Sequence, residues 1–252
     1  MAIIIKSPAE LARMRTACRL TGETLELIES MLVPGITTAE IDYAAEKFIL
    51  SQGARPSFLH YRGFPKSVCI SINEEVIHGI PSSRKLKEGD IASVDIGVFF
   101  DGFHGDAART LPVGKISADA TKLIEVTKQS FFEGIKFARA GNHVHDISKA
   151  VQDFVESNGF SVVREYVGHG VGKDLHEDPS VPNYRPPNRG ARLQAGMTIA
   201  VEPMVNIGGA AIKVLADKWT VITKDGSLSA HYENTIAITD GEPEILTLIN
   251  RG

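Results

Sequence analysis

The chain has 252 residues, with 27 lysines and arginines against 31 aspartates and glutamates, so its formal net charge is −4. Hydrophobic residues make up 43% and charged residues 23%, which is typical of a globular protein and excludes wholesale disorder. The length allows one large domain or two small ones. The negative charge argues against direct binding of nucleic acid, which a basic surface would favour.

The cysteines and the apolar runs indicate where the protein works. Two cysteines, Cys18 and Cys69, are too few for a disulfide scaffold and suit a reducing compartment. The apolar run at the start is too short for a signal peptide, and no stretch reaches the roughly 18 apolar residues of a membrane helix. We therefore expect a soluble, cytoplasmic protein that does not enter a membrane.

Two helices and then strands are predicted in the first half. Ser7-Pro8-Ala9-Glu10 combines an N-cap, a proline at the first helical position and a capping glutamate, and Pro34-Gly35 ends this helix. Thr37-Thr38-Ala39-Glu40 is a second capping box, whose helix ends at Gly53. Strands are expected next at residues 68–72, 91–100 and 103–113. Asp101-Gly102 predicts a hairpin between the last two strands.

The second half repeats this order. Helices are predicted from Ser117 to about Ala140 and from about Val144 to Asn158. Six small or apolar residues recur 106 positions later: Gly35, Ile41, Ala44, Phe48, Ser51 and Gly53 as Gly141, Ile147, Ala150, Phe154, Ser157 and Gly159. Leu86-x-x-Gly89-x-x-x-x-Val94-Asp95 recurs 107 positions later as Leu193-x-x-Gly196-x-x-x-x-Val201-Glu202. We predict one domain over 1–252 with two related halves, approximately 1–113 and 114–252, around a shared site.

A loop and more strands complete the second half. Residues 182–190, which contain Pro186-Pro187, are expected to be irregular, and a strand is expected at 197–205. Asp225-Gly226 predicts a hairpin between strands at 219–223 and 228–239.

The two carboxylates of the first hairpin are expected to lie close together. With Asp101-Gly102 as a two-residue turn, Gly97 faces Asp106, and Asp95 is the diagonal neighbour of Asp106 on the same face. Such neighbours lie about 7–8 Å apart at the backbone. A buried carboxylate is costly unless it is paired or binds a metal, and a divalent cation would relieve the repulsion between two of them.

The second half offers a matching set of polar residues. Glu202 corresponds to Asp95, and Glu233 lies in the strand His231-Tyr232-Glu233-Asn234-Thr235. Gly168-His169-Gly170-Val171-Gly172 places a histidine between glycines, which allows a close approach. The spacings of nucleotide-binding loops, of H-E-x-x-H zinc proteases and of G-x-S-x-G hydrolases do not occur.

The chain resembles the methionine aminopeptidases over essentially its whole length, and most closely their short bacterial type I form. The resemblance is carried by His78-Gly79, Asp95, Asp106, Gly168-His169-Gly170-Val171-Gly172, His176, Val201-Glu202-Pro203 and Glu233. It implies a pita-bread fold of the α/β (α+β) class, with two pseudo-symmetric helix–helix–strand halves around a central antiparallel sheet. Asn234 departs from the family pattern, in which a histidine commonly follows the last glutamate, so the tuning of Glu233 by its neighbour is expected to differ.

The resemblance also implies a ligand set for two divalent metal ions. Asp95 and Asp106 would bind one ion, His169 and Glu202 the other, and Asp106 and Glu233 would bridge both. These hard donors suit Mn²⁺, Fe²⁺, Co²⁺ or Zn²⁺ without choosing among them. Two such ions about 3.5–4 Å apart can share a water, lower its pKa and deliver hydroxide to a peptide carbonyl.

Further residues match the family positions that act on the substrate. His78 and His176 would hydrogen-bond the substrate and the developing oxyanion, and Glu202 would carry a proton from the water to the leaving amine. Four residues would line a methionine pocket: Tyr61, Phe64, Cys69 and Trp219. The implied activity is removal of the N-terminal methionine from nascent polypeptides with a small second residue. The enzyme is expected to act near the ribosome as a monomer.

Two other functions are compatible with parts of this pattern. An Xaa-Pro peptidase of the same fold shares the metal ligands but usually carries a large extra N-terminal domain. A binding module that has lost its metals would lack ligands, whereas all five ligand positions are occupied here by metal-binding residue types. Metal analysis together with an assay on Met-Gly and Xaa-Pro peptides would separate these functions.

Overall fold

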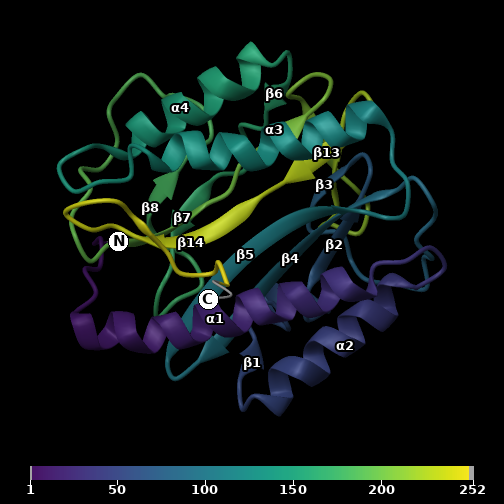
Figure 1. Cartoon of the computed structure of the whole chain (residues 1–252), viewed down its shortest axis with the longest axis horizontal. Coiled ribbons are helices and arrows are strands. Elements are labelled where there is room, and N and C mark those ends of the chain that lie inside the picture. The colour runs from purple at the N-terminus through teal and green to yellow at the C-terminus, as the bar shows by residue number, and fades with distance from the viewer. Residues whose placement is uncertain (1, 250–252) are drawn as a thin grey trace.

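The computed structural model describes residues 2–249 (Figure 1). Within this range there are four α-helices: α1 (Pro8–Met31), α2 (Thr38–Ser51), α3 (Ala118–Ile135) and α4 (Val144–Ser157). Both predicted capping boxes form, since Ser7 and Glu10 exchange hydrogen bonds at the start of α1, as do Thr37 and Glu40 at the start of α2. In the described residues no helix is both long and apolar enough to cross a membrane.

The predicted third helix begins as expected but ends early. The Ser117 hydroxyl accepts from the Ala120 N–H, which caps α3. The helix stops at Ile135 rather than near Ala140, and Arg139 then forms a parallel bridge with Thr239. Pairing with a distant segment replaces the last predicted helical turn. Local helix signals contain no information about such pairing.

The largest sheet described is antiparallel and has nine strands. Seven follow one another in the order β1 (Arg55–Pro56), β4 (Ile91–Phe100), β5 (Phe103–Pro112), β14 (Glu233–Ala237), β9 (Thr198–Val201), β7 (Gly168–Gly170) and β8 (Glu177–Val181). In addition, β2 (Cys69–Ile72) pairs with β4, and β15 (Glu244–Ile245) pairs with β14. The centre of the sheet is the β5–β14 pair, where the two halves of the chain join.

Two three-stranded sheets flank the large one. The first has the order β13 (Ser229–His231), β10 (Met204–Asn206) and β6 (Ser161–Val162). The second has the order β11 (Ile212–Val214), β12 (Val221–Thr223) and β3 (Glu75–Ile77). A short 3₁₀ helix, η1 (Tyr61–Gly63), lies between β1 and β2.

The hairpin of the first half has the predicted register. Phe100 pairs with Phe103, and Gly97 pairs with Asp106. Asp101 and Gly102 both have positive φ, 49° and 83°, as the tight turn between two twisted strands requires. The alternation of side chains therefore brings Asp95 and Asp106 to one face of the sheet, as expected.

Three strand predictions in the second half were wrong. The strand expected at 197–205 is interrupted at Glu202-Pro203, and the one at 228–239 at Tyr232, where the Tyr232 N–H donates to the Pro203 carbonyl. At these points the first segment passes from the large sheet to a small one, and the second passes from that small sheet to the large one. The hairpin at Asp225-Gly226 does not form either, because β12 pairs with β3 and β11 while β13 pairs with β10 in the described sheets.

The backbone has the same conformation at corresponding points of the two halves. Gly35 and Gly141 both have φ of +97°, and their N–H groups donate to Leu86 and Leu193 at 2.8 and 2.9 Å. Further matched pairs are Gly53 (70°) with Gly159 (84°), and Gly89 (92°) with Gly196 (89°). An L side chain rarely adopts such angles, so glycine is needed at each of these positions.

Each half has its own hydrophobic core. One cluster, built from residues 20–113, packs α1 and α2 against β2, β4 and β5. Another cluster is built from residues 120–238 together with Ile91, and it packs α3 and α4 against β9, β13 and β14. In Figure 1 the α1–α2 pair and the α3–α4 pair accordingly lie on opposite sides of the strands.

Candidate metal centre

A cavity of about 320 Å³ lies where the two halves meet. All eleven residues that the sequence singled out line it: Tyr61, Phe64, Cys69, His78, Asp95, Asp106, His169, His176, Glu202, Trp219 and Glu233. Its remaining walls come from residues that the sequence did not single out: Phe58, Arg62, Ile77, Glu165, Tyr166, Val167 and Leu175.

The first two carboxylates come from the regular β4–β5 ladder. Asp106 is 3% exposed, and one oxygen each of Asp95 and Asp106 has no hydrogen-bond partner within residues 2–249. Burial raises the pKa of Asp95 to about 7. Burial, and then the charges of Asp95 and Glu202, raise the pKa of Asp106 well above its usual value. Two ionised carboxylates here would be unstable without a counter-charge.

The second two carboxylates lie where the strands of the other half are interrupted. Asn234 pairs with Val201 in the large sheet, and Met204 pairs with His231 in the small one. Glu202 and Glu233 therefore lie at the junction between these two ladders. Burial, followed by the charges of neighbouring carboxylates, raises the pKa of both Glu202 and Glu233 well above the usual range.

His169 occupies the middle of β7 and directs one nitrogen at the carboxylates. Its Nδ1–H donates to the Gly170 carbonyl at 2.9 Å, while Nε2 lies 3.5 Å from Glu202 Oε1 and 3.8 Å from Asp106 Oδ2. Burial lowers the pKa of His169 to about 4, so the ring is neutral and keeps a lone pair at Nε2. A backbone hydrogen bond at the far nitrogen is typical of metal-binding histidines.

The glycines around His169 have a structural reason. A Cβ atom at Gly168 would lie 2.4 Å from the Ala200 carbonyl oxygen, and one at Gly170 would lie 2.2 Å from that of Asp178. The close approach that the sequence predicted is thus made by the backbones of neighbouring strands, which hold His169 between β8 and β9.

These side chains fit divalent metal ions. Two sets of potential ligand atoms lie within 4.8 Å of one another: Asp106, His169 and Glu233 form one, and Asp95, His231 and Glu233 the other. Bound cations would give the unpartnered carboxylate oxygens a partner and would remove the repulsion between the carboxylates. Oxygen-rich sets with imidazole suit Mn²⁺, Fe²⁺, Co²⁺ and Zn²⁺.

The two histidines expected to contact the substrate lie on the cavity wall. His176 Nδ1 is 2.9 Å from the Tyr61 hydroxyl, and its ring centroid is 4.1 Å from that of His169. Burial, and then the charges of His169 and Arg62, lower the pKa of His176 to about 3. Burial, and then His176, lower the pKa of His78 to about 4. Both rings are therefore neutral near pH 7.

The four residues expected to form the methionine pocket belong to one apolar cluster. The cluster consists of Phe58, Phe64, Cys69 and Leu175, with Tyr61, Ile80 and Trp219 packed against it. The Phe64 and Trp219 rings meet edge to face with centroids 5.1 Å apart. Burial, and then the charge of Asp95, raise the pKa of Cys69, which acts as an apolar wall rather than as a nucleophile.

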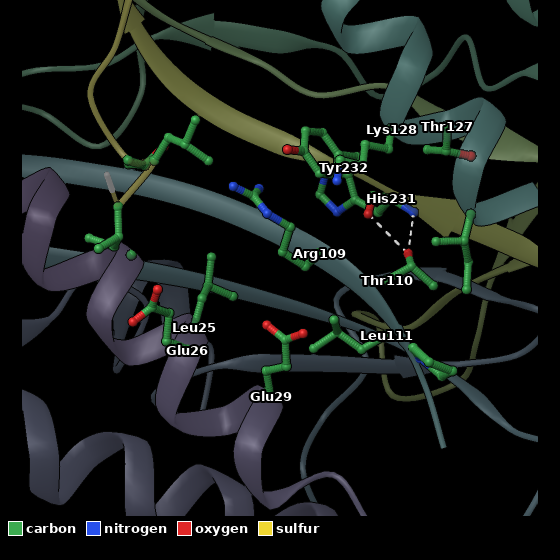
Figure 2. Close-up of a pocket in the computed structure, with 16 residues that line it drawn as sticks. Leu25, Glu26, Glu29, Arg109, Thr110, Leu111, Thr127, Lys128, His231 and Tyr232 are labelled. Carbon is green, nitrogen blue, oxygen red and sulfur yellow. Dashed lines mark hydrogen bonds between the residues drawn. The ribbon is translucent and has the colours of Figure 1, made fainter. Parts of the chain in front are cut away.

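A second cavity, of about 340 Å³, lies between α1, α3, β5 and β13 (Figure 2). Arg109 lies in it over the Tyr232 ring, and its guanidinium donates to the Glu233 carbonyl and, at 2.6 Å, to Asn234 Oδ1. Asn234 also accepts from the Thr247 hydroxyl. Adjacent residues of a strand face opposite sides of the sheet, so the side chains of Asn234 and Glu233 point in opposite directions. The departure from the family pattern at Asn234 therefore affects the contacts behind the Glu233 backbone.

Sequence reasoning missed His231. This residue is 2% exposed and is a member of the Asp95–Glu233 ligand set. A signal was present, because His231 precedes Glu233 by two residues in a strand-like segment, a spacing that places two side chains on one face.

Comparisons with known proteins agree with this site. Residues 12–240 match metallopeptidase family M24. A methionine aminopeptidase of Clostridium perfringens is 57% identical over 247 residues, which are 98% of this chain and 99% of the relative. The crystal structure of methionine aminopeptidase from Rickettsia prowazekii has a TM-score of 0.96 and 42% identity, covering 98% of this chain and all of that one.

A more distant likeness shows the fold alone. Prolidase from Pyrococcus furiosus has a TM-score of 0.81 at 21% identity, and the match covers 66% of its chain. The predicted pita-bread fold is confirmed by these neighbours. The family match over most of the sequence and the close relatives lead to one conclusion: the chain belongs to metallopeptidase family M24.

Proposed function

We propose that this protein is a methionine aminopeptidase that removes the N-terminal methionine when the second residue is small. The observation that carries the proposal is the single 320 Å³ cavity, in which four carboxylates and His169 lie beside an apolar pocket. The relatives named methionine aminopeptidase, at 48–57% identity over nearly the whole chain, support the same activity.

The proposed centre holds two divalent ions. Asp95 and Asp106 would hold one, His169 and Glu202 would hold the other, and Asp106 and Glu233 would contribute to both. Bound there, Co²⁺, Mn²⁺, Fe²⁺ or Zn²⁺ would supply Lewis acidity toward a peptide carbonyl and toward water. The free α-amine of a substrate would bind at this centre, so a blocked amine should not be accepted.

The protein's own side chains orient the substrate and move protons. With the Tyr61 hydroxyl donating to Nδ1, neutral His176 keeps its proton on Nε2 and donates it to the oxygen of the scissile carbonyl. His78, which lies edge-on to the Tyr166 and Trp219 rings, holds the substrate from the other side. The Glu202 carboxylate takes a proton from water and passes it to the leaving amine.

The apolar cluster selects the side chain. Tyr61, Phe64, Cys69 and Trp219 offer a polarisable surface that suits an unbranched thioether. Pockets of this kind separate side chains that differ by a methylene by only about 1–3 kcal/mol, so slow cleavage of close methionine analogues is expected.

The partners and location follow from this activity. The proposed substrates are the N-termini of nascent polypeptides, which the enzyme meets in the cytoplasm near the ribosome. We propose that one chain is one catalytic unit and acts as a monomer.

A peptide panel assayed with Mn²⁺ and with Co²⁺ tests the proposal. Peptides that begin Met-Ala should be cleaved, while those that begin Met-Lys, Leu-Ala, Ala-Pro or formyl-Met-Ala should be poor substrates or inert. Preference for Ala-Pro would favour an Xaa-Pro peptidase. No cleavage with any metal would favour a binding module.

A further inference from the structure

The buried ring of His231 makes no hydrogen bond with the rest of the described chain. Its side chain is 2% exposed, and neither Nδ1 nor Nε2 has a hydrogen-bond partner among residues 2–249. Buried polar atoms in native proteins are nearly always paired, so such a ring needs an explanation. A bound ion is one of the few physical explanations for such a ring.

The backbone that carries the ring is fixed by hydrogen bonds of its own. The Thr110 hydroxyl accepts from the His231 N–H at 2.7 Å and donates to the His231 carbonyl at 2.9 Å (Figure 2). Met204 pairs with His231 across the β10–β13 ladder. The backbone of His231 is therefore held by its own contacts, and the ring nitrogens are not needed to anchor the strand.

The ring faces the carboxylates at the same range as His169. His231 Nε2 lies 3.7 Å from Glu233 Oε2 and 3.9 Å from Glu202 Oε2. The corresponding distances from His169 Nε2 to its two carboxylates are 3.5 and 3.8 Å. Direct hydrogen bonds are shorter than this. Metal–nitrogen and metal–oxygen bonds of about 2.0–2.2 Å each, meeting at one ion, span such separations.

We propose that His231 is a sixth metal ligand, which binds through Nε2 the ion held by Asp95 and Glu233. Asp95, His231 and Glu233 offer ligand atoms that all lie within 4.8 Å of one another, as do Asp106, His169 and Glu233. Each ion then has one imidazole, His231 on one side of Glu233 and His169 on the other. The inference rests on the proposed metal centre and adds a ligand to it.

Counting coordinated imidazoles by NMR tests the proposal without an activity assay. Protein labelled with ¹⁵N in its eight histidines is titrated with Zn²⁺, and the ring nitrogens that shift on binding are counted. The wild type should show two coordinated rings. His231→Gln, which keeps a hydrogen-bonding group of similar size, should show one and should bind one of its two ions more weakly by roughly 100-fold, since even indirect partners of a metal cost 10–100-fold.

A matched control lies outside the cavity. His145→Gln, in the first turn of α4, should leave two coordinated rings and unchanged affinity. Two bound ions with one coordinated ring in the wild type, or a His231→Gln protein with wild-type affinity, would overturn the ligand role of His231 while leaving the metal centre intact. A wild type that binds no ion would refute the metal centre and the His231 ligand together.

Discussion

The two halves of the molecule build the same site by different means. In the first half, Asp95 and Asp106 lie on a hairpin of two uninterrupted ten-residue strands, and strand alternation alone brings them together. In the second half, Glu202 and Glu233 lie at breaks where the chain crosses between the large sheet and a small one. One pair of carboxylates is thus positioned by local pairing and the other by tertiary contacts.

The largest effect is expected from a change in the first-half pair, Asp95 and Asp106. Asp106→Asn should lose metal affinity and reduce activity to background, because a carboxylate shared by both proposed ions is removed. Metal content measured on the purified variant, together with turnover of a Met-Ala peptide, provides the test. Asp101→Asn, in the exposed turn of the same hairpin, is the matched control, since asparagine tolerates its positive φ. Full metal content and turnover in Asp106→Asn would refute the ligand assignment.

The next effect concerns the loop of the second half that carries His176. His176→Ala should lower kcat by about 10²–10³, the usual loss for one oxyanion donor. Metal content should stay unchanged, because the proposed role lies outside the ligand set. Loss of an ion in this variant would instead place His176 among the ligands.

Removing the metal should expose the repulsion between the two carboxylate pairs. The pKa of Asp95 is raised to about 7, and those of Asp106, Glu202 and Glu233 are raised well above their usual values. The folded metal-free protein therefore keeps protons that the unfolded chain has released, and the contribution of Asp95 to its stability falls as pH rises from about 4 through 7. The lowered pKa values of the buried histidines act in the opposite sense, but only below about pH 6.5.

Urea unfolding of the metal-free protein checks this pH dependence. The free energy of unfolding should be lower at pH 8.5 than at pH 6.5 by about 1 kcal/mol, the contribution of Asp95 at about 1.4 kcal/mol per proton and pH unit. Asp106→Asn should reduce the difference, and added Mn²⁺ should abolish it. Equal or greater stability at pH 8.5 would contradict the carboxylate cluster.

The smallest effect asks whether the halves are equivalent outside the site. Gly35→Ala and Gly141→Ala should each lower the free energy of unfolding by about 1–2 kcal/mol, since both glycines have φ of +97°. Among the described residues, a Cβ at Gly35 meets nothing within 4 Å and one at Gly141 only Arg192 at 4.0 Å, so strain is the whole cost. Unequal losses measured by urea unfolding would show that the two turns are not equivalent.

The sequence could predict the features that local pairing sets, and it could not predict those that tertiary contacts set. Short-range signals place the caps of α1 and α2 and the β4–β5 register, because each depends on residues a few positions apart. The interruptions at Glu202-Pro203 and Tyr232 depend on which sheet each segment joins. Pro203 did indicate the first of these interruptions, since proline cannot donate to a ladder within a sheet. His231 was missed because its neighbours Asp95 and Glu202 are distant in sequence.

The central claim is that the halves meet around two metal ions in one cavity, and a crystal structure of the protein with Mn²⁺ tests it most directly. Anomalous difference density should show two peaks in the 320 Å³ cavity, one beside Asp95 and Asp106 and one beside His169 and Glu202, with Glu233 between them. A cavity without such peaks at saturating Mn²⁺, or ions bound only elsewhere, would contradict the account.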